Sequence, residues 1–259
     1  ASDGEETCSG GAGHGAAKAR GDQPRRWRVD TLNGTTGRAA LDYVASELCI
    51  ADAVCLQEMA ANAACARTMQ NDFKARGWTV TINDSCSTQG RVRDGLSAGT
   101  AVGAKKHWGT CLLPGQHSTV IAEHRISAMH WMAVVKGGVD LASVYLVSGE
   151  GPSAANAGLL DALGDKLLHL NRPFVVGGDW QMTSEDLESM GWVQRVGGVI
   201  VRPSAEYPPS CKSGVGRTID FFVVSKGLEH LVADCYVVQQ ARTTPHRPVR
   251  IEFHSSMRA

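Results

Sequence analysis

The sequence lacks any apolar run of the roughly 20 residues that a helix needs to cross a bilayer. None of its 8 cysteines forms a Cys-x-x-Cys pair, so neither a zinc site nor a compact disulfide framework is indicated. Neither sign of charge is in excess, because 26 Lys and Arg balance 26 Asp and Glu, and net charge argues neither for nor against a nucleic-acid partner. The amino-terminal stretch has no apolar core of the kind found in secretory signals. We therefore expect no membrane association and a reducing, intracellular location, the nucleus included.

The sequence does contain the composition of one globular domain, with 259 residues of which 43% are hydrophobic and 20% charged. Residues 1–26 are rich in Gly and Ala and end in Pro24-Arg-Arg26, which predicts a disordered lead. Residues 27–259 show no internal repeat and no linker, so we expect a single α/β domain with mixed strands. The chain opens on Ala, which is compatible with an excised or processed fragment.

Hydrophobic periodicity and turn residues predict the secondary structure. Strands are expected at 27–32, 53–56, 78–82, 96–104, 118–123, 126–135, 139–147, 174–176, 192–201, 218–224, 235–238 and 246–253. Helices are expected from Thr35 or Thr36 through Leu48, at 62–76, at 153–168, and briefly after Thr183 or Ser184. Cys55 lies within an apolar run, which favours a buried free thiol.

The stretch from Asn171 to Met182 is the most informative part of the chain. Phe174 to Val176 predicts a buried strand, and two glycines then precede Asp179 and Gln181. A carboxylate and an amide two residues apart point to the same side of an extended chain. At the carboxyl end of a strand in an α/β sheet, such groups often form a catalytic site. A helix cap or a turn is the structural alternative for Asp179.

Other polar residues also end or interrupt apolar strands, namely Asn33, Glu58, Tyr145, Asp220 and His246. Four of them also have a purely structural explanation: a turn position for Asn33, a solvent-facing position for Glu58, a core position for Tyr145 and a surface position for His246. Asp220 is harder to explain structurally, because an unpaired carboxylate within a buried strand is costly.

The segments that contain these residues, taken in chain order, resemble the signatures of the endonuclease/exonuclease/phosphatase superfamily. This superfamily includes DNase I, abasic-site endonucleases of the exonuclease III type and the endonucleases of non-LTR retroelements. Its Leu-Gln-Glu metal-binding signature is intact here as Leu56-Gln-Glu58. The remaining similarities are Val29-Asp-Thr-Leu-Asn-Gly34, Ala142-Ser-Val-Tyr-Leu146, Gly178-Asp-Trp-Gln181, Thr218-Ile-Asp-Phe-Phe222 and Thr244-Pro-His-Arg-Pro-Val249. The resemblance extends from about Trp27 to the carboxyl end.

The resemblance implies a DNase I-like fold, a four-layered α/β sandwich of two packed mixed sheets flanked by helices. It implies that Glu58 binds Mg²⁺, or Mn²⁺ in its place, with Asn33 beside it, and such hard oxygen ligands suit Mg²⁺. Asp179 would position or deprotonate the attacking water, and His246 would bind the scissile phosphate. The catalytic set implied in this way is Asn33, Tyr145, Asp179, Gln181, Asp220 and His246.

Two departures from the family pattern concern activity. Gln181 stands where the family has Asn, and a displacement of about 1 Å in a positioning group can cost about a hundredfold in rate. Pro245 stands where the family has Asp, so we expect His246 to lack an orienting carboxylate and to be neutral and poorly fixed.

Two functions of different classes remain open. The first is a Mg²⁺-dependent phosphodiester hydrolase, acting on nucleic acid, DNA more than RNA, in preference to inositol phosphates or sphingolipid. The second is a catalytically degenerate domain that binds nucleic acid or a protein partner. A phosphate-tracking face is also considered for Arg91, Arg93, Lys105 and Lys106.

Overall fold

The computed structural model describes residues 26–88, 95–111, 113, 120–131 and 134–255. The predicted lead lies outside the described residues, apart from Arg26, which begins the first strand. Arg91 and Arg93 also lie outside them. No helix in the described ranges is long and apolar enough to span a membrane. The described cysteines are all free, and Cys55 is fully buried, as predicted.

The strands are β1 Arg26–Asn33, β2 Ala53–Gln57, β3 Trp78–Asn83, β4 Cys86–Ser87, β5 Leu96–Ser97, β6 Thr100–Lys105, β7 Thr110–Cys111, β8 Val120–Ala122, β9 Ile126–Trp131, β10 Val139–Tyr145, β11 Phe174–Asp179, β12 Gly198–Val201, β13 Asp220–Ser225, β14 Val232–Val237 and β15 Val249–His254. The helices are α1 Gly37–Val44, α2 Ala63–Ala75, α3 Ala154–Leu170, α4 Ser184–Ser189 and α5 Trp192–Arg195, with short 3₁₀ helices η1 Lys106–Trp108 and η2 Lys226–Leu231.

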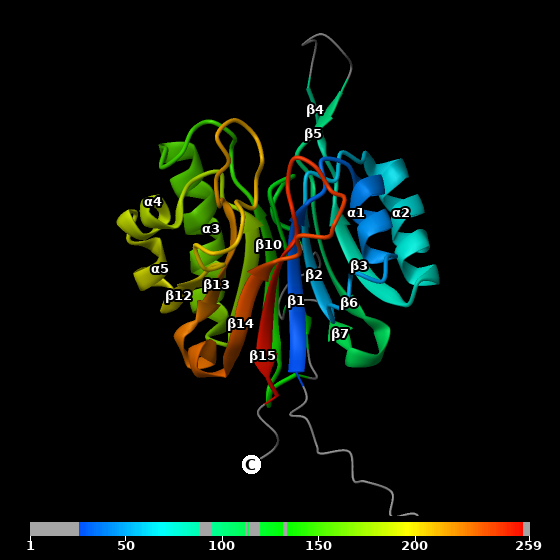
Figure 1. Ribbon diagram of the computed structural model, residues 1–259. Coiled ribbons are helices and arrows are strands. Elements are labelled where there is room, and N and C mark those ends of the chain that lie inside the picture. The colour runs from blue at the N-terminus through cyan, green and yellow to red at the C-terminus, as the bar shows by residue number, and fades with distance from the viewer. Residues whose placement is uncertain (1–25, 89–94, 112, 114–119, 132–133, 256–259) are drawn as a thin grey trace, which may run out of the picture.

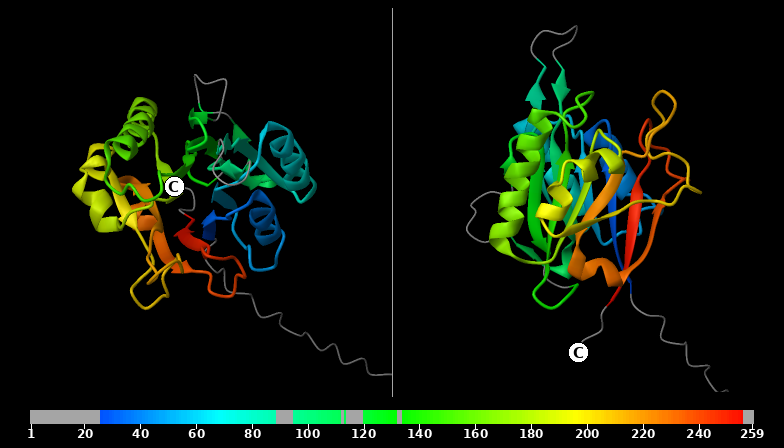
Figure 2. Two further views of the ribbon diagram at one scale, coloured as in Figure 1. Left: turned by 90° about the horizontal axis from the view of Figure 1, so that it is seen from above. Right: turned by 90° about the vertical axis from the view of Figure 1, so that its left-hand side faces the viewer.

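Two large mixed sheets pack face to face (Figures 1 and 2). The first sheet has six strands in the order β14-β15-β1-β2-β6-β3, and the second has seven, in the order β12-β13-β11-β10-β9-β7 with β8 beside β9. Helices α1 and α2 cover the outer face of the first sheet, and α3, α4 and α5 cover that of the second (Figure 1). The four-layered α/β sandwich expected from the sequence is thereby confirmed.

Aromatic side chains fill the core between the two sheets, and a glycine lets the sheets approach more closely at one end. Trp27 of β1 stacks on Phe253 of β15 with ring centroids 3.8 Å apart, and it meets Trp131 of the second sheet edge to face. Gly177 of β11 sets a closer approach, because a Cβ there would lie 3.0 Å from the Cβ atoms of Thr31 and Cys55. Gly177, two residues before Asp179, therefore lets the end of β11 lie against the first sheet.

Helix caps account for several confirmed boundaries. Thr36, Asn62 and Ser153 each accept a hydrogen bond from a backbone N–H in the first turn of α1, α2 and α3. Thr183 and Asp186 form a reciprocal capping box at α4.

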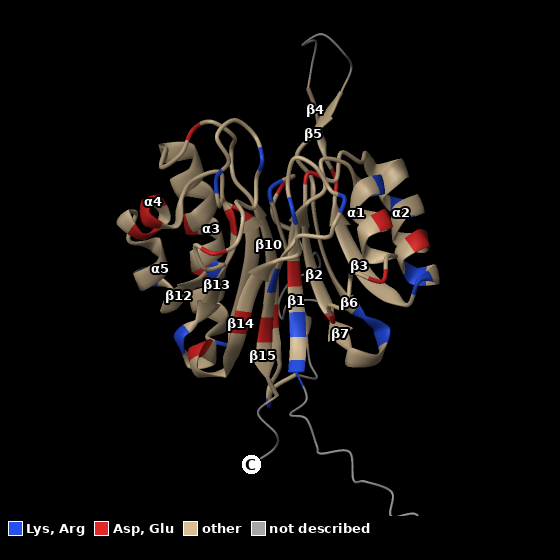
Figure 3. Cartoon of the chain, in the orientation of Figure 1, with Lys and Arg blue, Asp and Glu red and all other residues tan. Residues whose placement is uncertain are grey.

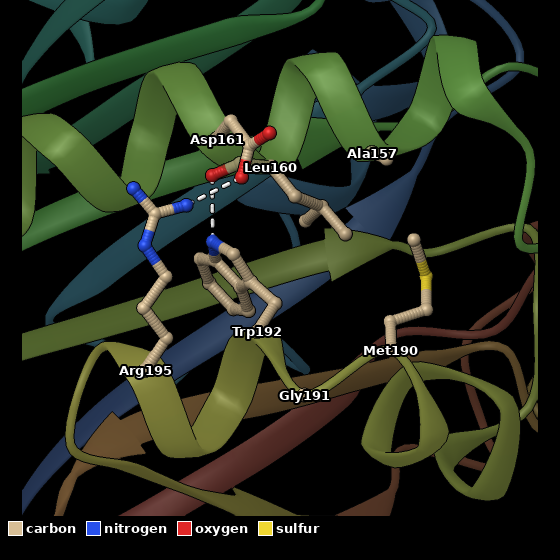
Figure 4. A pocket seen from close by; sticks show the side chains of 7 residues that line it. All are labelled: Ala157, Leu160, Asp161, Met190, Gly191, Trp192 and Arg195. Carbon is tan, nitrogen blue, oxygen red and sulfur yellow. Dashed lines mark hydrogen bonds and ion pairs between the residues drawn. The ribbon is translucent and has the colours of Figure 1, made fainter.

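The strand predicted at 192–201 and the predicted end of the first helix were both wrong. The strand predicted at 192–201 begins as α5, because Trp192 packs on α3 and donates its indole N–H to the Leu160 carbonyl, as Figure 4 shows. The strand starts at Gly198, after Gly197 adopts a φ of 64°. Helix α1 ends at Val44, so Leu48 lies beyond it, 36% exposed.

Candidate active site

Three polar side chains stand next to one another at one end of the second sheet. Tyr145 of β10 is the cross-strand partner of Asp179 of β11, and Asp179 is the partner of Asp220 of β13. Strands β10 and β11 are parallel and both end here, while the antiparallel β13 begins here. The sheet topology therefore brings together residues that lie far apart in the sequence.

Asn33 joins this row from the first sheet. Its Nδ2 donates to Asp179 Oδ2 at 2.8 Å, and its Oδ1 accepts the Thr35 backbone N–H at 2.8 Å. Gln181 adds two more donors to Asp179, with Nε2 2.6 Å from Oδ2 and the backbone N 3.2 Å from Oδ1. The fully buried Asp179 carboxylate is thus held by three N–H groups from both sheets.

The turn after Asp179 is fixed by Trp180. This buried indole stacks on Phe221 with centroids 5.3 Å apart and donates to the Phe221 carbonyl at 3.0 Å. The next residue, Gln181, adopts a left-handed φ of 54°, which is uncommon for a residue with a side chain. Packing of the indole therefore maintains a strained turn that aims the Gln181 amide at Asp179.

His246 lies against both carboxylates. Its Nδ1 is 2.9 Å from Asp220 Oδ2, and its Nε2 is 3.7 Å from Asp179 Oδ2. The expectation that Pro245 leaves His246 without an orienting carboxylate was therefore wrong. Asp220, on a strand 26 positions earlier in the chain, supplies that carboxylate.

Asp220 is in turn fixed by Ser210, a residue that the sequence did not single out. Ser210 Oγ donates to Asp220 Oδ2 at 2.6 Å and accepts the backbone N–H groups of Ile219 and Asp220. Because a Ser before such a strand is common and the contact spans ten positions, no local signal reveals it.

The charges in this cluster shift two pKa values. Burial disfavours the charged imidazole, but the charge and hydrogen bond of Asp220 outweigh it and raise the pKa of His246 to about 10. Burial, reinforced by the Asp220 charge, raises the pKa of Asp179 to about 7, against opposing contributions from His246 and Asn33. The site thus pairs a cationic imidazole with a carboxylate that titrates near neutral pH, as a general base requires.

Replacing Asp220 with Asn is expected to lower the pKa of His246 from about 10 toward or below its usual 6.5, because burial then acts with much less opposition. The change is measured by an NMR titration of the imidazole. A matched control is Asp140→Asn, which removes the 2.7 Å contact between His130 and Asp140 at the other end of β10. A His246 titration that is the same in wild type and Asp220→Asn would contradict this account of the pair.

Glu58 follows directly on β2, whose last residue Gln57 is the cross-strand partner of Asn33 on the neighbouring strand β1. It has a φ of 55° and a half-buried side chain. Burial raises the pKa of Tyr145 to about 12, and the negative charges of Glu58 and Asp179 add to this effect. Glu58 therefore lies at the same end of the molecule as Tyr145. No hydrogen bond or ion pair engages the Glu58 carboxylate within the described ranges.

These groups fit a hard divalent cation. The Glu58 carboxylate has no partner among the residues that the structure describes, and the Asn33 amide oxygen retains one lone pair beyond its bond to Thr35. A Mg²⁺ site needs only one or two carboxylates, because the ion keeps several waters. Asp179, Asp220 and His246 also lie close enough to share a metal. The imidazolium, with a ring nitrogen toward each carboxylate, already provides the positive charge there.

Arg125 is a second residue that the sequence analysis missed. It precedes β9, and its guanidinium lies 4.9 Å from the centroid of the Tyr145 ring. The Tyr145 hydroxyl is 3.2 Å from Ser148 Oγ. Arg125 thus places a positive charge beside Tyr145, although an isolated Arg in a turn carries no sequence signal.

Lys105 and Lys106, which were considered for a phosphate-tracking face, lie away from the candidate site. In the register of β2 and β6, Thr100 lies opposite Gln57 and Ala104 opposite Ala53, so Lys105 is at the far end of the sheet from Glu58. Lys106 Nζ donates to the Lys74 carbonyl there.

Two hollows lie outside the row of polar residues. One, of about 140 Å³, lies between α3 and α5, where Arg195 pairs with Asp161 (Figure 4). A larger one, of about 500 Å³, lies between α1 and residues 240–244. Neither hollow is lined by Asp179, Asp220 or His246, so neither contains the candidate catalytic residues.

A known protein family matches most of the chain. The pattern of the Endonuclease/Exonuclease/phosphatase family matches residues 19–246. The chain belongs to this family. No curated protein sequence matches the chain.

Solved structures of other members of the fold are similar despite low identity. An AP endonuclease from Leishmania major is 18% identical over 89% of this chain and 88% of its own, with a TM-score of 0.67. The endonuclease domain of TRAS1, a telomere-specific non-LTR retrotransposon, is 13% identical over 89% and 99%, with a TM-score of 0.65. The 3′ phosphatase NExo from Neisseria, bound to a product DNA hairpin, is 18% identical over 88% and 99%, with a TM-score of 0.57.

Proposed function

We propose that this family member is a divalent-metal-dependent phosphodiester hydrolase that acts on nucleic acid. The observation that carries the proposal is the continuous set of contacts from Asn33 through Asp179 and His246 to Asp220. The Glu58 carboxylate, unpaired among the described residues, lies at the same end of the molecule. Two of the structural neighbours, an AP endonuclease and a 3′ phosphatase bound to a product DNA hairpin, support nucleic acid as the substrate class.

Each side chain has a role that follows from its surroundings. Asp179 takes a proton from the attacking water, since burial raises its pKa to about 7. His246 donates Nε2–H to a phosphoryl oxygen, because at 3.7 Å this nitrogen lies beyond normal hydrogen-bond distance of Asp179. Asp220 keeps that imidazole protonated and oriented.

Glu58 and Asn33 hold the cation, for which we propose Mg²⁺, with Mn²⁺ as the substitute. When bound, such an ion neutralises charge that develops on the phosphoryl oxygens. The Tyr145 hydroxyl and the Arg125 guanidinium orient the phosphate from the β10 side. In this proposal both groups act on the negative charge that develops in the transition state, and such preorganisation is the largest single contribution in many enzymes.

Gln181 supports activity in this proposal, although the family pattern has Asn. Its Nε2 reaches Asp179 at 2.6 Å, so the longer side chain still delivers its amide. Gln181→Ala removes a donor to the ionised carboxylate, which raises the pKa of Asp179 further. We expect the rate at pH 7 to fall by about tenfold to a hundredfold, with the acidic limb of the pH–rate profile displaced to higher pH. Gln194→Ala, at an exposed position of α5, is the control. An unchanged profile would show that Gln181 does not act on Asp179.

A substrate panel tests the proposal. With Mg²⁺, the full chain is expected to cleave supercoiled plasmid or an abasic-site duplex, and to leave inositol phosphates and sphingomyelin intact. Hydrolysis of the lipid or inositol substrates alone would refute the nucleic-acid assignment. Binding of DNA without any turnover would favour the degenerate binding module instead.

A further inference from the structure

The hollow of about 500 Å³ lies between helix α1 and residues 240–244, which belong to the loop that joins β14 to β15. This loop runs beside α1 in two views of the molecule (Figures 1 and 2). The volume is within the roughly 300–1,000 Å³ that is typical of small-molecule sites. None of the candidate catalytic residues lines the hollow. A ligand of matching size would therefore bind beside the candidate active site and not within it.

The walls of the hollow present apolar groups. Ala39 and Tyr43 lie on one face of α1, and Leu48 and Ala241 extend the walls. Leu48 is one of the few large apolar side chains that the fold leaves exposed. The Tyr43 hydroxyl donates to the buried Asp30 carboxylate, so its polar end is already engaged and Tyr43 offers the hollow its ring. Such a surface favours a planar, apolar group.

One charge at the hollow is unpaired. Among the described residues that line it, only Asp42 and Arg242 carry a full charge. Asp42 pairs with Arg38, 3.1 Å away on the same helix, and α1 thus bears both signs of charge (Figure 3). Arg242 is exposed and has no ion pair or hydrogen bond within the described ranges. Beside it, the buried Thr243 hydroxyl also lacks a partner there. The hollow therefore complements an anion that accepts hydrogen bonds.

Both walls of the hollow continue into the candidate active site. Residues 240–244 lead directly to His246, and α1 begins shortly after Asn33. Thr35 connects the two walls, because its backbone N–H donates to Asn33 Oδ1 at 2.8 Å and its hydroxyl donates to the Thr244 carbonyl at 3.4 Å. An occupant that touches both walls therefore contacts the two segments that hold Asn33 and His246.

We propose that this hollow binds a small aromatic anion, with its rings between Tyr43 and Leu48 and its acid group on Arg242. The inference goes beyond the proposed function, because it assigns a second ligand site and requires no turnover. A compact anion fits better than a nucleic-acid strand, since a strand has a charge at every nucleotide and would meet one unpaired cation here beside the Asp42 carboxylate. Occupation of the hollow is expected to be felt at His246 through the shared loop.

Fluorescence titration of the full chain in EDTA tests the site with two probes. They are 8-anilinonaphthalene-1-sulfonate and N-phenyl-1-naphthylamine, which has the same rings without the sulfonate. The wild type is expected to bind the sulfonate about tenfold more tightly, because it gains a charge-assisted hydrogen bond. Arg242→Gln is expected to remove this difference and to leave binding of the uncharged amine unchanged. Lys226→Gln, which changes an exposed cation on η2, is the matched control.

Two further variants test the apolar walls. Leu48→Ser removes part of one wall, and Ala39→Trp fills the hollow. Each is expected to weaken the binding of both probes by about tenfold or more, and circular dichroism checks the fold. If Ala39→Trp does not fold, Leu48→Ser decides this point alone. Leu168→Ser is the control, since Leu168 is a similarly exposed leucine on α3, and it is expected to bind both probes like the wild type.

NMR spectra show whether the candidate active site senses the ligand. The sulfonate probe is expected to shift the backbone amide signals of Thr244 and His246, and binding that leaves both signals unchanged would overturn the link to that site. Equal sulfonate binding by the wild type, Arg242→Gln and Leu48→Ser would overturn the proposal, because the probe would then lie elsewhere. So would displacement of the probe by a DNA duplex, since that result assigns the hollow to the nucleic-acid substrate. Failure to cleave any phosphodiester would refute the proposed function alone, because these titrations require no turnover.

Discussion

Replacing Glu58 with Gln is expected to abolish Mg²⁺ binding and to slow phosphodiester hydrolysis by about a thousandfold or more. The substitution removes the charge that holds a hard cation but keeps the shape of the side chain. Because no partner engages this carboxylate within the described ranges, the substitution leaves no group unsatisfied, and the fold is expected to be intact.

Isothermal titration with MgCl₂ measures the loss of binding, and circular dichroism checks the fold. Glu229→Gln is the matched control, since Glu229 is exposed on η2, at the opposite end of β13 from Asp220. An unchanged Mg²⁺ affinity in Glu58→Gln would show that Glu58 is not the ligand, even if activity were lost.

Replacing Asp179 with Asn is expected to slow hydrolysis by about a hundredfold to ten-thousandfold, which is the usual contribution of general acid–base catalysis. It is also expected to change how stability depends on pH in the metal-free protein. Burial raises the pKa of Asp179 from 3.8 to about 7. The group therefore contributes its full stability below the unfolded pKa, and this contribution is lost as the pH rises through about 7.

Urea unfolding in EDTA at several pH values between 4 and 9 measures this effect. Relative to wild type, Asp179→Asn is expected to gain stability as the pH rises from about 4 to about 7, because the neutral amide has no proton to lose. The control Asp42→Asn changes an exposed carboxylate on α1. Stability curves for wild type and Asp179→Asn that stay parallel would contradict the raised pKa.

The sequence located most of the site because the polar residues follow the strand order. Asn33 and Asp179 end strands of different sheets, both belong to the catalytic set that the resemblance implies, and a 2.8 Å hydrogen bond joins them. Asp220 was recognised because a carboxylate in an apolar strand demands a partner. The hydrophobic pattern placed these residues at or near strand ends, where strands meet at defined edges of a sheet, and the resemblance to the family grouped them into one set.

The pairing of His246 with Asp220 could not be inferred in the same way. It depends on how the loop after β14 returns to the start of β13, and adjacent residues such as Pro245 gave the wrong expectation. Arg125 and Ser210 act through contacts that only the folded chain creates. Similarly, α5 forms because Trp192 packs on α3, which overrides the apparent strand pattern.

Single-turnover cleavage of supercoiled DNA by the full chain, with Mg²⁺ and then with EDTA, tests the central claim most directly. The account predicts nicked product with Mg²⁺, none with EDTA, and recovery when Mg²⁺ or Mn²⁺ is added back in excess. Cleavage that persists in EDTA, or no cleavage with either metal ion, would contradict a metal-dependent phosphodiester hydrolase built on Glu58, Asp179 and His246.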